Sequence, residues 1–266
     1  IYCKEMQQLT TDDSISEVLT SIGLTDELFD NDNYKDSLTG FSNFEGFSRQ
    51  TQQILGKYPD RSYALYYINV KNFKLINEAF GHDVGDATLK RIADIFNKYN
   101  KSDEAFARVI SDTFVLFKEY TTKEQQITLF QDITKEIRES CTSIQNKYLV
   151  DFSAGILIID SDNNTMSINK LIDRVILATK SKSDLPGTNY TFYEDEFRQE
   201  YLQQANMENN MHKALATGEF LAYLQPKYDL INNQIIGSEA LVRWFSPING
   251  FMQPDTFIPI FERNGF

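Results

Sequence analysis

Residues 63–70 read Tyr-Ala-Leu-Tyr-Tyr-Ile-Asn-Val, a run dominated by aromatic and β-branched side chains. Such a run predicts a buried β-strand. The chain then turns at residues 72–74, and residues 84–98 carry apolar side chains at helical spacing. A buried strand that leads into an amphipathic helix indicates an α+β domain, in which helices pack against a sheet.

The rest of the chain alternates between strand-like and helical patterns. Residues 105–110 and 113–120 predict two strands, and Ser111 and Asp112 between them predict a tight β-hairpin. For residues 60–160 the predicted order of elements is β-α-α-β-β-α-β. The other predicted elements are helices over residues 122–146, 167–181 and 194–216, helices that begin near residues 41 and 255, and strands over residues 148–159, 190–193, 220–225 and 234–244.

Charge and composition narrow the classes of function. The 266 residues carry a formal net charge of −12, which argues against binding to nucleic acid or to an anionic membrane, because both need clustered Lys and Arg. A nucleotide is compatible with this charge, because it needs only a local positive pocket. The two cysteines lie far apart, which indicates a reducing cytoplasm, and no apolar run reaches the length of a membrane span. Since the chain does not begin with Met, we interpret it as a piece of a longer protein that could be membrane-anchored upstream.

The turn after the predicted strand carries polar residues that suit a nucleotide. Lys74 and the backbone N–H groups of the turn could bind phosphate oxygens, and Asn77 and Asp86 could contact a base edge. Helix capping and surface solvation explain the same residue types, and the residues by themselves favour that simpler interpretation.

Several motifs in this region resemble those of GGDEF domains, the family of diguanylate cyclases. Residues 73–86 contain Phe-Lys-x-x-Asn followed by Gly-His-x-x-Gly-Asp, which is similar to the family's nucleotide-binding segment. Residues 36–40, Asp-Ser-Leu-Thr-Gly, resemble its opening motif, and residues 175–180 resemble a late helix that ends in a lysine. The resemblance covers residues 34–194 and implies a central sheet wrapped by helices, as in nucleotide cyclases.

The resemblance also implies a chemistry and a set of binding residues. GGDEF domains join two GTP molecules across a homodimer with the help of divalent cations, usually magnesium. By the family's motif, Asn77 and Asp86 would contact guanine, Lys74 and Lys180 would contact phosphate, and Phe73 belongs to the same nucleotide-binding segment.

This sequence departs from the family where metal is bound. Asn69 and Thr113 stand at the positions of metal-binding acids, and magnesium is normally held by carboxylates. Asp112 keeps the position linked to activation of the attacking hydroxyl, so we regard it as a vestigial catalytic residue. Residues 110–111, Ile-Ser, replace two glycines, and Lys71 replaces a further acid. Magnesium is therefore expected to bind weakly or not at all, and the Lys71 ammonium either replaces part of the missing charge near Asn69 or is simply solvated.

Two further positions concern regulation and the hairpin. Lys101 and Glu104 occupy the places of the Arg and Asp of the family's product-inhibition site, but lysine lacks the planar fork of arginine, so we do not predict that site. Arg108 matches the Arg that usually precedes the signature hairpin.

The end of the chain resembles the start of an EAL domain, a cyclic-di-GMP phosphodiesterase on a TIM-like barrel. Residues 224–262 contain the motifs Leu-Gln-Pro, Gly-Ser-Glu-Ala-Leu-Val-Arg-Trp and Pro-x-x-Phe-Ile-Pro. By the family's pattern Glu239 would bind metal, Arg243 would contact the substrate phosphate, and Gln225 would lie at the substrate. The other ligands of that metal site are expected beyond the last residue, so this chain would hold an incomplete site.

These features predict a cyclic-di-GMP signalling protein. Its parts would be a linker or upstream tail (residues 1–33), a degenerate GGDEF domain (34–194), a connecting helix (195–216) and an incomplete EAL domain (217–266). The GGDEF domain is expected to bind GTP, to lack cyclase activity and to regulate the EAL domain of the parent protein, which would act on cyclic-di-GMP. The alternatives are an active diguanylate cyclase and a dimerisation scaffold that binds no nucleotide.

Overall fold

The computed structural model describes residues 32–142, 150–181 and 189–266. Its contacts divide the chain into two units, Ile1–Tyr193 and Glu194–Phe266. The predicted tail over residues 1–33 lies almost entirely outside the described residues, as do the end of the predicted helix 122–146 and the start of the predicted strand 148–159.

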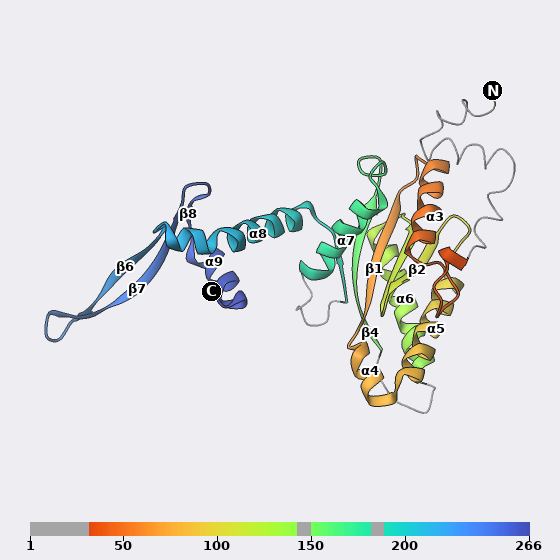
Figure 1. The fold of residues 1–266 in the computed structure, drawn as a ribbon, viewed down its shortest axis with the longest axis horizontal. Helices are drawn as coiled ribbons and strands as arrows, with labels where there is room; N and C mark the ends of the chain where they lie inside the picture. The colour runs from red at the N-terminus through yellow and green to blue at the C-terminus, as the bar shows by residue number, and fades with distance from the viewer. Residues whose placement is uncertain (1–31, 143–149, 182–188) are drawn as a thin grey trace, which may run out of the picture. The chain divides into compact units, whose positions relative to one another are not determined.

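A five-stranded sheet with the order β2-β3-β1-β4-β5 forms the centre of the first unit (Figure 1). The central strand β1 (Tyr63–Lys71) pairs antiparallel with β3 and with β4. The predicted hairpin is confirmed, because β2 and β3 flank Ser111 and Asp112 directly. The other strands are β2 (Ala105–Ile110), β3 (Thr113–Glu119), β4 (Asp151–Ile159) and β5 (Tyr190–Phe192), of which β2 and β5 form the edges.

Helices cover both faces of this sheet. The side chains of β1 alternate between the two faces, so that Tyr66 and Ile68 join one core and Tyr63 and Leu65 join the other. The first core packs against α5 and α6, and the second packs against α3 and α7. The helices are η1 (Asp32–Tyr34), α3 (Phe44–Lys57), α4 (Phe73–Phe80), α5 (His82–Lys98), α6 (Lys123–Thr142) and α7 (Ile168–Ser181).

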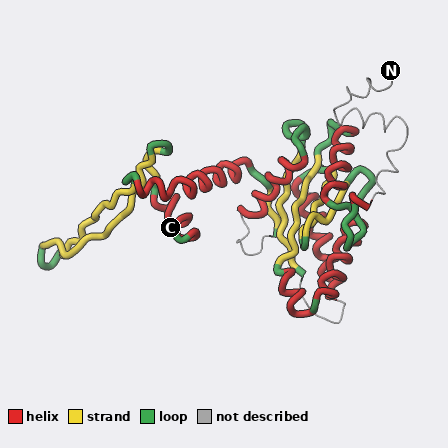
Figure 2. Tube along the Cα trace, in the orientation of Figure 1, coloured by secondary structure: helices red, strands yellow, loops and turns green. Residues whose placement is uncertain are grey.

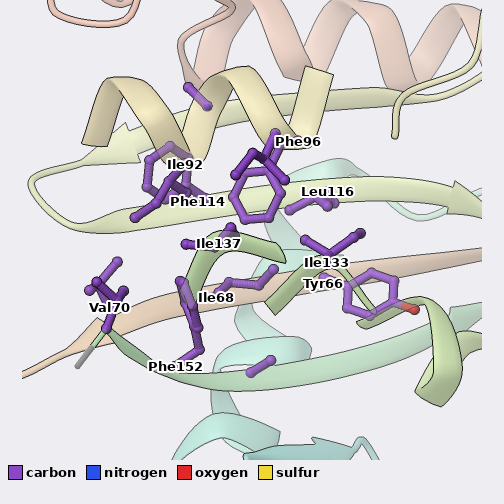
Figure 3. Close-up of a cluster of buried hydrophobic side chains, with 14 of the residues drawn as sticks. Tyr66, Ile68, Val70, Ile92, Phe96, Phe114, Leu116, Ile133, Ile137 and Phe152 are labelled. Carbon is purple, nitrogen blue, oxygen red and sulfur yellow. The ribbon is translucent and has the colours of Figure 1, made fainter. Parts of the chain in front are cut away.

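The core between the sheet and α5 and α6 is shown in Figure 3. Side chains from the three central strands, β3, β1 and β4, point into it and meet the apolar stripes of the two helices. The labelled residues are Tyr66, Ile68, Val70, Phe114, Leu116 and Phe152 from the strands, and Ile92, Phe96, Ile133 and Ile137 from the helices.

The chain reverses direction at the end of β1 by means of α4, the first of the two helices in the predicted order β-α-α-β-β-α-β. Asn72 adopts a left-handed conformation with φ of 55°, and the helix begins at the next residue. Phe73 and Ile76 are buried and hold α4 against the core, because they belong to the same apolar cluster as β1. Gly81, with φ of 89°, then separates α4 from α5, a conformation that suits glycine.

The second unit has a small core of its own. It contains α8 (Asp195–Ala216) and α9 (Pro254–Asn264), whose apolar side chains surround Trp244. Figure 2 shows a long antiparallel hairpin in the same unit. Its strands extend beyond the predicted ones and are β6 (Phe220–Asp229) and β7 (Gln234–Ser246), to which β8 (Gly250–Met252) adds a third. Within the described part of the chain, no helix combines the length and the apolarity needed to cross a membrane.

Candidate functional site

Two side chains predicted at metal positions meet at the end of β1. Asn69 and Thr113 are direct partners in the register of β1 and β3. The Thr113 hydroxyl donates a hydrogen bond to Asn69 Oδ1 over 2.7 Å, and the Thr113 residue is 5% exposed. The structure thus brings these two positions together, but both side chains are neutral and they bind each other.

This donor set does not fit a magnesium ion. Magnesium prefers carboxylate oxygens, and the oxygen that Asn69 could offer already accepts a hydrogen bond from Thr113. Among the described residues, no three His, Cys, Asp or Glu side chains come together as a metal-binding group. The only acid of the signature hairpin, Asp112, is half-buried in the turn, and its carbonyl oxygen accepts a hydrogen bond from the Val70 N–H at 3.1 Å.

Lys71, at the last position of β1, faces an acid on the neighbouring strand. Its Nζ lies 3.8 Å from Asp151 Oδ2, in a pair that the β1–β4 register places directly opposite. Asp151 Oδ1 accepts hydrogen bonds from Arg138 Nη2 at 2.7 Å and from Asn189 Nδ2 at 3.2 Å. Asn69 and Lys71 lie on the same face of β1 as expected, and two cations there share a single carboxylate.

The turn of the hairpin is tied to the beginning of the unit. Ser111 takes a left-handed conformation with φ of 49°, and its carbonyl oxygen accepts a hydrogen bond from Arg108 Nε at 2.7 Å. Arg108 also forms a salt bridge of 2.9 Å with Asp36, whose carboxylate accepts hydrogen bonds from the N–H and hydroxyl of Thr39. Burial raises the pKa of Asp36, but the hydrogen bonds from Thr39 and the ion pair with Arg108 outweigh burial and hold that pKa below its ordinary value.

The predicted guanine contacts lie where α4 and α5 meet. A Cβ atom at Gly85 would collide with the side-chain oxygen of Asn77 and would approach the Phe73 ring to 3.1 Å. Asn77 therefore packs directly over the first turns of α5, beside exposed Asp86. Lys74 is largely exposed and lies 3.5 Å from Glu78, one helical turn away.

Lys180 lies near the end of α7, on the helix that packs against β4. That helix crosses β4 so closely that a Cβ at Gly155 would strike the backbone oxygen of Val175 and the side chain of Thr179. Lys180 follows Thr179 and is exposed. Gly155 lies two residues after Ser153, and Ser153 is the β4 partner of Asn69. Residues two apart in a strand share a face, so the end of α7 covers the face of the sheet that holds Asn69.

The two residues at the product-inhibition positions behave differently from each other. Glu104 is buried and forms a 2.9 Å ion pair with Lys118, whose Nζ also donates to the Tyr99 carbonyl at 2.7 Å. Burial lowers the pKa of Lys118, and Glu104 opposes that shift. Lys101 is exposed, and its N–H donates to Glu104 at 2.9 Å. The Glu104 carboxylate thus holds the start of the hairpin together.

In the second unit, the predicted EAL residues share one face of the β6–β7 hairpin. Gln225 and Glu239 are direct register partners, and Arg243 lies four residues further along β7, opposite Leu221. Glu239 Oε2 lies 4.0 Å from Lys227 Nζ, with both side chains more than half exposed. The guanidinium of Arg243 donates to the neighbouring Val242 carbonyl at 2.8 Å.

The sequence did not predict two ion pairs that hold the site, Arg108 with Asp36 and Lys71 with Asp151. It named Asp36 and Arg108 as parts of separate motifs, but the salt bridge between them joins positions that only the folded sheet brings together. It also missed Asp151 as the partner of Lys71. Asp151 lies within the predicted strand 148–159, but the register that pairs it with Lys71 could not be predicted from either strand alone.

Two family profiles match this chain, one in each part. The family profile described as "Diguanylate cyclase, GGDEF domain" matches residues 33–184, and the profile described as "EAL domain" matches residues 208–266. The bifunctional diguanylate cyclase/cyclic di-GMP phosphodiesterase MucR of Pseudomonas aeruginosa is 27% identical over 206 residues, which cover 77% of this chain and 30% of MucR. The chain spans about a third of the length of the curated relatives that it matches.

Two solved structures share the fold. The GGDEF domain of DgcB from Caulobacter crescentus, in complex with c-di-GMP, has a TM-score of 0.52 at 18% identity, covering 61% of this chain and 96% of that one. The S helix-GGDEF-EAL structure of Vibrio cholerae LapD, bound to c-di-GMP, has a TM-score of 0.51 at 14% identity, covering 92% of this chain and 57% of that one. The predicted α+β architecture is confirmed by these likenesses.

Proposed function

Because the chain belongs to the diguanylate cyclase GGDEF family and continues into the start of an EAL domain, we propose that its GGDEF domain binds GTP without condensing it and regulates an attached EAL phosphodiesterase domain. The relatives are cyclic-di-GMP signalling proteins, whose names describe a bifunctional enzyme in one case and a phosphodiesterase in another. The proposal concerns what the GGDEF domain of this chain contributes to such signalling.

One observation carries the proposal, namely the contrast between the two halves of the site. At the metal positions, Thr113 and Asn69 form a neutral hydrogen-bonded pair. At the proposed guanine positions, the side-chain oxygen of Asn77 lies against Gly85, the residue that precedes exposed Asp86. The residues that would recognise a base remain, and the residues that would activate a phosphate do not.

Condensation of GTP needs more than recognition. In the family's chemistry a metal ion offsets phosphate charge and activates the attacking oxygen. Asp112 keeps its position in the hairpin, but one carboxylate beside a Thr–Asn pair does not reproduce that arrangement. Cyclase activity is therefore lost, with magnesium bound weakly or not at all.

The nucleotide would act on the parent protein through residues 195–216, the predicted connecting helix, which forms α8 at the beginning of the second unit. In that protein the complete EAL domain would hydrolyse cyclic-di-GMP, using Glu239, Gln225 and Arg243 together with residues supplied by the rest of its barrel. Pairing of two GGDEF domains into a homodimer is part of the same proposal. The GGDEF domain would then serve as a GTP sensor in the cytoplasm.

Calorimetric titration of the chain with GTP tests the proposal. We expect saturable binding of GTP, and we expect Asn77→Ala to weaken it by about tenfold or more, because hydrogen bonds to a base edge contribute about 1–3 kcal/mol when their loss leaves polar groups unpaired. Asn169→Ala is the matched control, since Asn169 is exposed near the beginning of α7. Chromatography of the mixture should show no cyclic-di-GMP.

Two outcomes would contradict the proposal. Absence of binding at millimolar GTP, with and without magnesium, would leave the dimerisation scaffold, which light scattering can detect. Formation of cyclic-di-GMP would establish the active cyclase instead.

A further inference from the structure

The end of β1 carries a lysine, Lys71, beside the positions where the family would hold a metal ion. Asn69 and Lys71 share one face of the strand, and Thr113 and Asp151 are their register partners on either side. Arg138 adds a second cation, at 2.7 Å from Asp151. Asp151 is thus shared by two cations, and the Asn69–Thr113 pair on the same face of β1 as Lys71 is neutral, so an anion can approach Lys71.

We propose that this site holds the polyphosphate of a guanine nucleotide without a divalent cation, and that the Lys71 ammonium supplies the positive charge that a metal ion would otherwise bring. This inference rests on the proposed function, because it concerns how the same nucleotide is bound. It follows from the misfit between magnesium and the residues present.

The contacts of Lys71 leave its ammonium available to a phosphate. The Asp151 oxygen that is hydrogen-bonded, Oδ1, is occupied by Arg138 and Asn189, whereas Lys71 lies 3.8 Å from the other oxygen, beyond hydrogen-bond distance. The side chains of Lys71 and Asp151 are 33% and 34% exposed. A pair of this kind is weak in water, and a phosphate can compete for the lysine.

Other basic residues surround the same end of the sheet. Lys74 lies in the first turn of α4, directly after the strand, and its side chain is 87% exposed. Lys180 arrives from α7, which packs on β4 at Gly155 and so covers the face that holds Asn69. A nucleotide that Asn77 holds by its base at the α4–α5 junction would place its phosphates among these lysines.

The Thr113–Asn69 hydrogen bond explains why a cation gains little here. A metal ion at Asn69 Oδ1 would have to compete with the Thr113 hydroxyl for that oxygen, and it would meet the Lys71 charge next to it. A phosphate has neither obstacle, since it is attracted by Lys71 and needs no acid nearby.

The test is GTP affinity measured by calorimetry on the whole chain, in excess EDTA and in millimolar magnesium. We expect affinity in magnesium to be no higher than in EDTA. Lys71→Ala should weaken binding by about tenfold, or about 1.4 kcal/mol, and Lys71→Arg should retain most of it. Lys170→Ala, which removes an exposed lysine of α7, should leave the affinity unchanged. Thermal unfolding followed by circular dichroism checks that every variant is folded, as expected for Lys71→Ala because Asp151 keeps Arg138.

A double variant serves as the positive control, because it shows that the assay can detect a magnesium-dependent increase in GTP affinity. Asn69→Asp combined with Thr113→Glu should bind GTP more tightly in magnesium than in EDTA. If the unmodified chain loses GTP binding in EDTA, the inference is overturned while the proposed function stands. If binding is independent of magnesium but Lys71→Ala leaves it unchanged, the role of Lys71 is overturned. If GTP binds in neither condition, the proposed function itself fails.

Discussion

Asp36 shows how one side chain can support a distant turn. Its carboxylate accepts hydrogen bonds from the backbone and the hydroxyl of Thr39, and it also forms the salt bridge with Arg108, which in turn holds the Ser111 carbonyl. The side chains of Arg108 and Asp36 are 14% and 15% exposed, so water screens their interaction less than that of a surface pair.

The pKa of Asp36 gives a pH-dependent prediction for its removal. Because the pKa is below its ordinary value in the folded state, the ionised carboxylate stabilises the fold above about pH 4, and this contribution is lost as the pH falls through the lowered pKa. Asp36→Asn should reduce the free energy of unfolding by about 1–3 kcal/mol at neutral pH, the range for hydrogen bonds to charged groups. The reduction should shrink as the pH falls below about 4.

Urea denaturation at several pH values checks this. Asp173→Asn, at an exposed position on α7, serves as the control and should leave the free energy of unfolding nearly unchanged. A destabilisation by Asp36→Asn that is the same at every pH would show that the charge of the carboxylate is not the cause.

Among the elements, the close approach of α4 and α5 at Gly85 links packing to recognition. The methyl group of Gly85→Ala would meet the flexible end of the Asn77 side chain and the edge of the Phe73 ring. We expect Asn77 to rotate away, so that GTP affinity falls about tenfold or more, as for Asn77→Ala. The fold should remain stable, since alanine is favoured over glycine inside a helix by up to about 1 kcal/mol.

Gly56→Ala is the matched control for that substitution. Gly56 lies near the end of α3, and a Cβ there would have no neighbour within 4 Å. Calorimetry should show unchanged GTP affinity, and thermal unfolding should show equal or greater stability. Equal loss of affinity in both variants would mean that the contact between Asn77 and Gly85 does not matter for binding.

The elements also show which parts of the fold could be predicted from the sequence. The strand at residues 63–70 and the hairpin around Ser111 were recognised because residue type and periodicity are local signals. The predicted order of elements included a helix between β1 and α5, but not its bounds, because the eight residues of α4 are held by the burial of Phe73 and Ile76 rather than by a long apolar stripe. Strand order and register, which bring Asp151 to Lys71, depend on pairing between distant segments and gave no local signal.

The candidate site was predictable to a similar degree. The motif resemblance named Asn69 and Thr113 at metal positions, and the structure places the two side chains in direct contact. The hydrogen bond between Thr113 and Asn69 and the salt bridge between Arg108 and Asp36 could not be predicted. Such side-chain contacts depend on the three-dimensional arrangement of distant segments of the chain. The roles of Asn77, Asp86, Lys74 and Lys180 stay predictions until nucleotide binding is measured.

For the whole molecule, the division into two units can be followed with one natural probe. The chain has a single tryptophan, and Trp244 is buried in the core of the second unit, where its Nε1 donates to Glu219 at 2.9 Å. Tryptophan fluorescence therefore reports on the second unit, while far-ultraviolet circular dichroism also contains the large contribution of the first. If each unit folds around its own core, the two signals should have different midpoints in urea.

GTP sharpens this prediction. A ligand stabilises the unit that binds it, by an amount that grows with its concentration. Saturating GTP should move the circular dichroism transition of the first unit to higher urea and leave the fluorescence midpoint of Trp244 in place. Coincident transitions that move together would show that the chain unfolds as one cooperative body.

The central position of β1 has a consequence for the kinetics of folding. The β2–β3 hairpin is local and can form early, but β1 reaches its neighbour β4 only after a long intervening stretch of chain has folded, as the pairing of Tyr63 with Ile159 shows. The proposed nucleotide site needs β1, the hairpin and the end of α7 at once, so it is complete only late on the folding pathway. A bound nucleotide would therefore slow the unfolding of this domain and would do little to speed its folding.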